Sequence, residues 1–530
     1  MKNKLLLMPV FLLAALSASG CASNDEVEYV LRVLNSADYI YEAETEEDDP
    51  DMMDQFVTYM EEEKGIKVSY VYDTFDTNET CYNELMTGKS SYDIICVSDY
   101  MVQKMISSNL IQPLYEESIE EDERLEEIYG NVSQYLWDKF ENIHPKDKTT
   151  NEYMDVSIDQ YSVPYMWGTV GMMYNPSFYE DLEEDEVIEL FNSWEALYEE
   201  ETNNSFSIKD SVRDVYAVSI LHAYYESDIL PLEEKLENGE ITEAEFNSKL
   251  NDIFNRCDDE AIAKVKEDML SLKANSFGFE VDSGKTDMVE GKIGANLAWS
   301  GDATWAIFEA QSDYETELYF SVPDEGSNIW FDAFCIPNTC GNKDIAIDFL
   351  NFMSMPENAI QNMDYVGYTS AVAGDEVLDY VYDLYDVRRE VGGEALDEGE
   401  VYDISYFFSD RLTDYEIEDA VLNAWRLDTD YVLVDEEEES EIPASVYARM
   451  LRSAFPRSEQ LSHLVIMDDY GNRNEAVLDM WERVRTNALP LWAIIVFIIE
   501  AVVAAAAIAA FFIIKRTKKV LRMKRKGLKK

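Results

Sequence analysis

The sequence predicts an α/β protein of two lobes joined by crossing strands, with one membrane-spanning helix near its C-terminus. Short apolar segments alternate with helical ones, which is typical of parallel sheets covered by helices. An apolar run at 161–175 is interrupted by glycines; it is too apolar for a loop and too broken for a helix, so we interpret it as a strand between lobes. A second apolar run at 489–514 is long enough to cross a bilayer, which takes ~20 residues.

Composition favours a globular, strongly acidic body. The chain has 530 residues, 47% of them hydrophobic, and a formal net charge of −67. Ten basic residues fall in 515–530, so the body is more acidic still. Such a surface repels nucleic acid and anionic lipid and attracts cations, although acidity of this kind also serves solubility alone.

The N-terminus has the pattern of an export signal at 1–20: a basic start, an apolar run and small residues before Cys21. Ala18-Ser19-Gly20-Cys21 resembles a bacterial lipobox, in which the cysteine is lipidated and becomes the first residue. The alternative is simple secretion with an unmodified Cys21. Residues 21–28 are then a polar spacer.

At the other end, the basic tail 515–530 follows the predicted span at 489–514. Positive charge beside a span favours the cytoplasmic side, so the body should face outward. Glu500 lies near the middle of the span. It is either protonated and tolerated there or in contact with another membrane subunit.

Residues 29–160 should form the first part of lobe 1. Loops that follow strand ends in such a sheet are where ligands bind. We expect strands at 29–34, 66–72 and 92–97, and helices at 50–63, at 78–87 and from about 98 to 108.

Residues 161–325 should form lobe 2. Ser211 precedes a predicted helix at 212–225, and Asp214 stands three residues later, which is a capping-box pattern with Asp in place of Glu. Asp214 could therefore serve only its own helix. We also expect a charged, exposed helix at 233–250 and a strand at 293–299 that leads into a helix from Ser300.

The return segment 326–373 should lead back into lobe 1. In an extended strand, side chains alternate between faces, so Trp330 and Asp332 point the same way. An indole face beside a carboxylate suits an organic cation. The alternative is an ordinary strand with Trp330 in the core.

The composition shifts after this segment. Residues 374–456 form an acidic insertion, in which the like-charge run 436–441 is expected to be unstructured. Residues 457–486 are interpreted as C-terminal helices, with a helical segment at 459–484.

Nothing in the sequence predicts a metal, a cofactor or catalysis. The cysteines beyond Cys21 have no metal-ligand spacing, and the three histidines are scattered. Cys335 and Cys340 could close a short loop or remain thiols. No nucleophile elbow or zinc-binding histidine motif stands out, so we predict that the protein is not an enzyme.

Several of these stretches, in their shared order and spacing, carry a family pattern. The chain resembles the extracytoplasmic spermidine/putrescine-binding proteins of polyamine ABC importers. This implies a two-lobed periplasmic-binding-protein fold of type II-like topology that closes over its ligand. The matching stretches are 34–40, 92–114, 161–175, 291–303, 322–337 and 342–369, with a weaker match at 455–485.

The resemblance also implies a site in which carboxylates pair with ligand ammonium groups and aromatic rings cover the methylenes. Ser36-Ala37 replaces a Trp-Thr pair often found in the first loop, Ser211 replaces an Asp, and the family's pocket Gln aligns near Met467. The implied ligand-binding residues are Tyr39, Ser98, Tyr100, Asp214, Trp299, Trp330, Asp332 and Tyr368.

The implied function is the capture of polyamines at the extracytoplasmic face of the cell membrane and their delivery to permease subunits. Cys21 and the C-terminal helix would hold the protein there. The alternatives are a binding protein for another small organic cation and a membrane-anchored sensor that signals through a partner.

Overall fold

A computed structural model describes residues 29–486, except positions 44, 46–48, 116–118, 120–121, 282, 391, 394–398 and 436–439. The predicted signal at 1–20, the lipidation site Cys21, the span at 489–514 and the tail at 515–530 lie outside the described residues. Within the described ranges, no helix combines the length and the apolar character that crossing a membrane requires.

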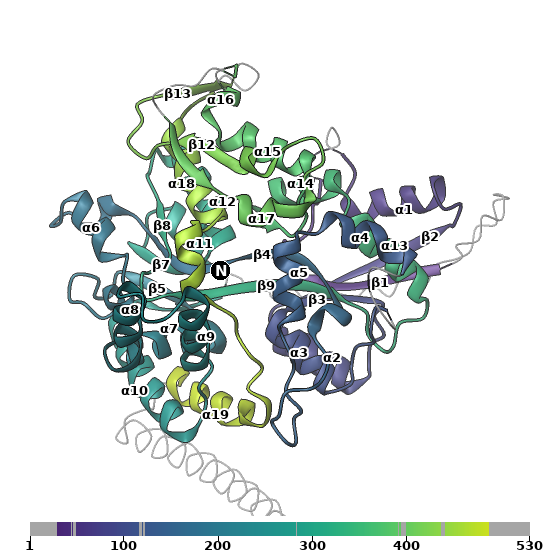
Figure 1. Cartoon of the computed structure of the whole chain (residues 1–530), viewed down its shortest axis with the longest axis horizontal. Helices are drawn as coiled ribbons and strands as arrows, with labels where there is room; N and C mark the ends of the chain where they lie inside the picture. The colour runs from purple at the N-terminus through teal and green to yellow at the C-terminus, as the bar shows by residue number, and fades with distance from the viewer. Residues whose placement is uncertain are drawn as a thin grey trace, which may run out of the picture.

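One sheet of eleven strands runs through both lobes (Figure 1), in the order β2-β1-β3-β9-β4-β7-β5-β6 with β8 and β10 on β4 and β15 on β9. Its middle strands, β4 (Ser162–Tyr174) and β9 (Ser327–Cys335), are antiparallel neighbours that connect the lobes. All thirteen residues of β4 are buried, which explains its apolar sequence. The predicted crossing strands are confirmed.

Lobe 1 contains the parallel strands β1 (Tyr29–Ser36), β2 (Val68–Phe75) and β3 (Ile94–Ser98), with the short β10 (Thr369–Ser370) beside β4. The predicted strands and helices of this lobe match to within a few residues. Its helices are α1 (Met52–Glu62), α2 (Asn78–Thr87), α3 (Asp99–Ser107), α4 (Glu126–Asn131), α5 (Gln134–Glu141), α13 (Lys343–Met353) and α14 (Pro356–Val366).

Lobe 2 contains the parallel strands β5 (Phe206–Lys209), β6 (Gly278–Glu280) and β7 (Ala295–Trp299), and β8 (Tyr319–Ser321) pairs with β4. Its helices are α6 (Glu184–Leu190), α7 (Val212–Tyr224), α8 (Leu230–Glu237), α9 (Glu243–Phe254), α10 (Asp259–Asn275), α11 (Ser283–Val289) and α12 (Ser300–Tyr314).

The helical segment expected at 233–250 is helical but consists of two helices, α8 and α9, of which α9 is not fully exposed. The chain turns at Gly239, whose φ of 67° suits glycine, and α9 restarts with a capping box between Thr242 and Glu245. Phe246 and Leu250 of α9 are buried, so this segment also contributes to the core.

The insertion 374–456 is a folded layer in contact with both lobes (Figure 1). On the lobe 1 side, the Arg411 guanidinium donates to the Val132 carbonyl at 2.7 Å. On the lobe 2 side, the Thr304 and Ser453 hydroxyls lie 2.8 Å apart. Its elements are α15 (Asp375–Tyr385), α16 (Val387–Glu390), β11 (Gly399–Asp403), α17 (Ser405–Phe408), β12 (Val421–Trp425), β13 (Val432–Asp435), β14 (Ser440–Pro443) and α18 (Ala444–Ala454).

Part of the run expected to be unstructured is therefore ordered, because residues 440 and 441 belong to β14, while 436–439 lie outside the described residues. The helix expected at 459–484 is also wrong over its first half. There the chain forms β15 (Leu464–Val465), which pairs with β9, and only α19 (Asn474–Arg485) is an α-helix.

Candidate ligand-binding site between the lobes

Polar and aromatic side chains gather where the parallel strands of both lobes end. Ser98 is the last residue of β3, and Lys209, Glu280 and Trp299 end β5, β6 and β7. The carboxyl ends of parallel strands share one edge of a sheet, which is where open α/β folds bind ligands. This rule applies within each lobe. The ends of β3 and β7 face each other because both strands pair antiparallel, at offset positions, with the crossing strands β9 and β4.

Asp332 of β9 lies at the centre of the site. The Tyr39 hydroxyl donates to Asp332 Oδ2 at 2.7 Å and the Ser98 hydroxyl to Oδ1 at 2.6 Å. Ser98 faces Asp332 in the β3–β9 register, and Asn78 Nδ2 donates to Ser98 Oγ at 2.9 Å. Two predicted residues, Tyr39 and Ser98, therefore hold the predicted Asp332 carboxylate in place, and Asn78, which was not predicted, supports Ser98.

The Asp332 carboxylate has no ion-pair partner among the described residues. Burial raises the pKa of Asp332, hydrogen bonds from Ser98 and Tyr39 oppose the rise, and the charge of Asp214 adds to it. Asp332 is half-buried, and a largely desolvated carboxylate without a cation is unfavourable until a positive group pairs with it. The site is therefore electrostatically suited to an ammonium group.

Aromatic rings surround this carboxylate. The Trp330 and Tyr368 rings are edge-to-face at 5.4 Å between centroids, and Tyr368 and Tyr39 are edge-to-face at 5.6 Å. Trp330 is 8% exposed, and its Nε1 is buried without a hydrogen-bond partner among the described residues. Trp330 therefore packs in the core, as the alternative interpretation held, and also stands beside Asp332.

Two glycines make room for these rings. A Cβ at Gly168 of β4 would meet Ser300 Oγ and lie 2.7 Å from Trp330 Cζ2, and a Cβ at Gly301 of α12 would meet the Tyr368 ring. Any larger residue would displace the ring that it meets. Gly168 of the crossing strand and Gly301 of α12 thus leave the space that these two rings occupy.

Asp214 begins α7 on the lobe 2 side. Its backbone N–H donates to Ser211 Oγ at 3.4 Å, which is the expected cap, while its side chain is buried. Burial raises the pKa of Asp214, and hydrogen bonding to Ser211 and Trp299 and the charges of Lys209 and Arg213 oppose the rise. The cap uses the Asp214 backbone N–H, whereas the carboxylate itself is near Ser211, Trp299 and the charges of Lys209 and Arg213.

Trp299 lies against a cation that the sequence reasoning missed. Lys209 Nζ is 4.4 Å from the centroid of the Trp299 ring and 3.0 Å from Asp302 Oδ2. Tyr368 donates to Asp302 Oδ1 at 3.0 Å, which joins the two halves of the site. The available signal was a lysine that ends a buried strand segment, Phe206–Lys209, where a charge requires a partner.

Tyr100 is not an open wall of the site. The Arg213 guanidinium lies over its ring at 4.6 Å, and also over the Tyr470 ring at 3.8 Å. The Tyr100 hydroxyl points to Glu79 Oε1 at 3.4 Å. Tyr100 thus connects lobe 1 to lobe 2 and the C-terminal segment through Arg213.

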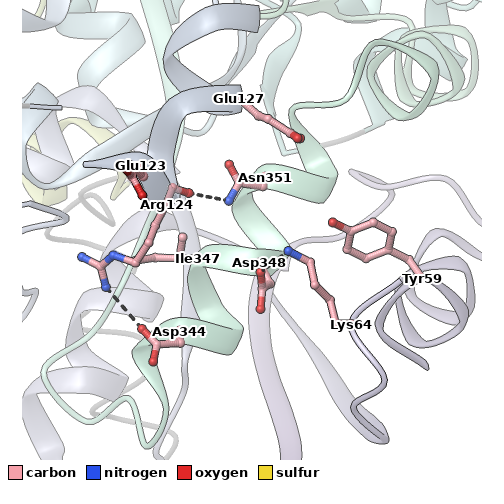
Figure 2. A pocket seen from close by; sticks show the side chains of 9 residues that line it. All are labelled: Tyr59, Lys64, Glu123, Arg124, Glu127, Asp344, Ile347, Asp348 and Asn351. Atoms are coloured by element: carbon pink, nitrogen blue, oxygen red, sulfur yellow. Dashed lines mark hydrogen bonds and ion pairs between the residues drawn. The ribbon is translucent and has the colours of Figure 1, made fainter. Parts of the chain in front are cut away.

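The structure has a further pocket outside this site. A surface pocket of about 230 Å³ in lobe 1 is lined by ion pairs such as Lys64–Asp348 and contains none of the predicted ligand-binding residues (Figure 2). Cys335 and Cys340 are free thiols. Within the described ranges, no group of three or more His, Cys, Asp or Glu side chains is arranged to hold a metal ion.

Comparison with known proteins gives a consistent family. Residues 54–375 match the model for bacterial extracellular solute-binding proteins. The spermidine/putrescine-binding periplasmic protein of Salmonella typhimurium is 26% identical over 354 residues, which cover 67% of this chain and 79% of that protein.

The putrescine-binding periplasmic protein PotF of Escherichia coli is 26% identical over 360 residues, or 67% of this chain and 82% of that protein. Among solved structures, a chain assigned to a spermidine/putrescine ABC transporter from Listeria monocytogenes superposes with a TM-score of 0.53 at 22% identity. The match covers 86% of this chain and 99% of that one, which supports the fold.

Proposed function

The chain belongs to the bacterial extracellular solute-binding proteins, and we propose that it captures a polyamine and delivers it to the permease subunits of an ABC importer. Membership of this family makes it a binding protein rather than an enzyme. The spermidine- and putrescine-binding relatives support the choice of ligand class.

The observation that carries the proposal is the Asp332 carboxylate, which has no ion-pair partner in the part of the chain that the structure describes and lies among aromatic rings. Its two oxygens accept hydrogen bonds from Tyr39 and Ser98, so the carboxylate is oriented before a ligand arrives. An ammonium would pair with it, and the Trp330 and Tyr368 rings would cover methylenes. A neutral analogue would leave the carboxylate unpaired and should be rejected.

Asp214 is proposed as a second carboxylate for the ligand, because it is buried in the first turn of α7 and aligns with an acid that binds a terminal amine in the family pattern. Tyr368 of lobe 1 donates to Asp302 of lobe 2, and Arg213 of lobe 2 lies over Tyr100 of lobe 1. Contacts of this kind would form as the lobes close, expel water from the ligand and present a closed surface to the permease.

We also propose that the protein is held at the outer face of the membrane at both ends. Cys21 would carry a lipid, and residues 489–514 would span the bilayer with the tail 515–530 inside. The support is the lipobox-like sequence, the length of the apolar run and the basic tail.

The test is calorimetric titration of the full chain in an uncharged detergent with putrescine, cadaverine, spermidine and spermine at two salt concentrations. We expect one-to-one binding that changes little with salt, because the paired charges are buried. Weak, multisite and salt-sensitive binding would mean that the acidic surface alone attracts cations, and the proposal would then fail.

A further inference from the structure

The protein itself supplies a cation to the candidate site, the ammonium group of Lys209. It is 2% exposed, and its ammonium lies 3.0 Å from Asp302 Oδ2 and 3.2 Å from Glu280 Oε1. The same nitrogen stands 4.4 Å from the centroid of the Trp299 ring. Two carboxylates and an aromatic face around one ammonium are the arrangement that a polyamine nitrogen itself would need.

This ammonium belongs to the same connected site as Asp332. Asp302, which holds Lys209, accepts a hydrogen bond from Tyr368 at 3.0 Å. The Tyr368 ring packs edge-to-face on both Trp330 and Tyr39, and Tyr39 donates to Asp332. The chain of contacts thus runs from the Lys209 cation through the aromatic rings to the unpaired carboxylate.

The Lys209 end and the Asp332 end of this series of contacts differ in how their charges are balanced. Asp302 faces Lys209 and, at 3.9 Å, also Lys285, so its negative charge is already matched by the protein. Asp332 and Asp214 enter no ion pair among the residues that the structure describes. A ligand ammonium is attracted to the Asp332 end, and one that reaches Trp299 meets a like charge.

We propose that the Lys209 ammonium occupies one amine subsite of the pocket, so that the protein selects short diamines and rejects triamines and tetraamines. This rests on the proposed polyamine function and specifies its ligand class. The Trp299 face is covered by the chain's own amine, which leaves Asp332 and Asp214 for the two ends of a short ligand. A third ligand nitrogen would have to displace Lys209 from two carboxylates.

The test compares Lys209→Met with Lys285→Met in the full chain in an uncharged detergent. Lys285 is a matched control, because its ammonium also faces Asp302 but its side chain is 32% exposed and lies over Trp305 at 5.2 Å. Titration with putrescine and spermidine should give a wild-type preference for putrescine of about tenfold or more, since like-charge juxtaposition costs several kcal/mol. Lys285→Met should keep this preference.

Lys209→Met should shift the ratio of the two affinities toward spermidine by about tenfold or more, because the incoming amine takes the vacated place. At equal saturation of the site, spermidine should also raise the thermal stability of this variant more than putrescine does, because only spermidine supplies an amine to Asp302. An unchanged ratio in Lys209→Met, or a wild-type protein that prefers spermidine, would overturn the inference and leave the polyamine function intact.

Removing Lys209 leaves two buried carboxylates, which can prevent folding. The double variant Lys209→Met/Glu280→Gln keeps Asp302 for the incoming amine and removes the second charge. It should show the same shift toward spermidine, and an unchanged ratio here also overturns the inference. A wild-type protein that binds none of the amines refutes the proposed function and the inference together.

Discussion

Replacing Asp332 with Asn should make the empty protein more stable and abolish tight ligand binding. The raised pKa means that the ionised carboxyl is less favourable in the folded state than in the unfolded one. By linkage, this penalty is present at neutral pH and disappears as the pH falls through the folded pKa toward the unfolded value of about 3.9. Asn keeps the shape and an oxygen for the Tyr39 or Ser98 hydroxyl.

The stabilisation of the empty protein should be about 0.5–2 kcal/mol at pH 7, which is the usual gain when a strained functional group is replaced. The loss of affinity should be about 2–5 kcal/mol, because a buried ligand ammonium would lose its partner. That loss corresponds to roughly 30- to 4,000-fold in the dissociation constant. Urea unfolding measures the first quantity and calorimetric titration the second.

Asp302→Asn is the matched control with the opposite sign. Burial opposes its ionisation, but the charges of Lys209 and Lys285 lower the pKa of Asp302. Its carboxylate thus stabilises the fold at neutral pH, and Asn there should destabilise the empty protein. If Asp332→Asn also proved destabilising, Asp332 would be a structural residue and the reasoning would be refuted.

Three further predictions follow from the same geometry. Gly168→Ala should weaken ligand binding by about tenfold or more and lower the free energy of unfolding, because the new Cβ meets Trp330. Calorimetric titration measures the affinity and urea unfolding the stability, and an unchanged affinity would contradict the prediction. Ligand affinity should fall as the pH is lowered through the raised pKa values of Asp332 and Asp214, and ligand binding should release protons from these carboxyl groups. Calorimetry in buffers of different ionisation enthalpy detects the released protons, and their absence would exclude this linkage. Arg213→Met should reduce the decrease in radius of gyration that small-angle scattering detects on ligand binding, because a contact that holds the closed lobes together is lost. A decrease equal to that of the wild type would show that this contact does not stabilise the closed form.

Local patterns and the family resemblance together were sufficient for the Asp332 half of the site. Alternation along the strand predicted that Trp330 and Asp332 share a face, and the family pattern indicated Ser98, which ends β3 opposite Asp332. These residues lie on few elements, and each element has a strong apolar pattern. Their relative placement follows from the sheet order.

The Lys209 half was not predictable in this way. Lys209, Glu280 and Asp302 come from β5, β6 and α12 and meet only in the folded lobe. No short pattern joins them, and the capping interpretation drew attention to Asp214 instead. The break in the helical segment at 233–250 could have been predicted, since Gly239 and the capping box that begins at Thr242 interrupt it.

The charges of the two carboxylates, Asp302 and Asp332, are balanced in opposite ways, and this difference affects ligand selectivity. At Asp302 the protein supplies the cation, so that half is stable without ligand and gains nothing from a further amine. At Asp332 the protein supplies only hydroxyl donors, so the ligand must bring the charge. Specificity is a difference between affinities, and a repulsive group contributes to it as much as an attractive one. The attraction at Asp332 would therefore define the ligand as an amine, and the cation at Lys209 would limit how many amines it carries.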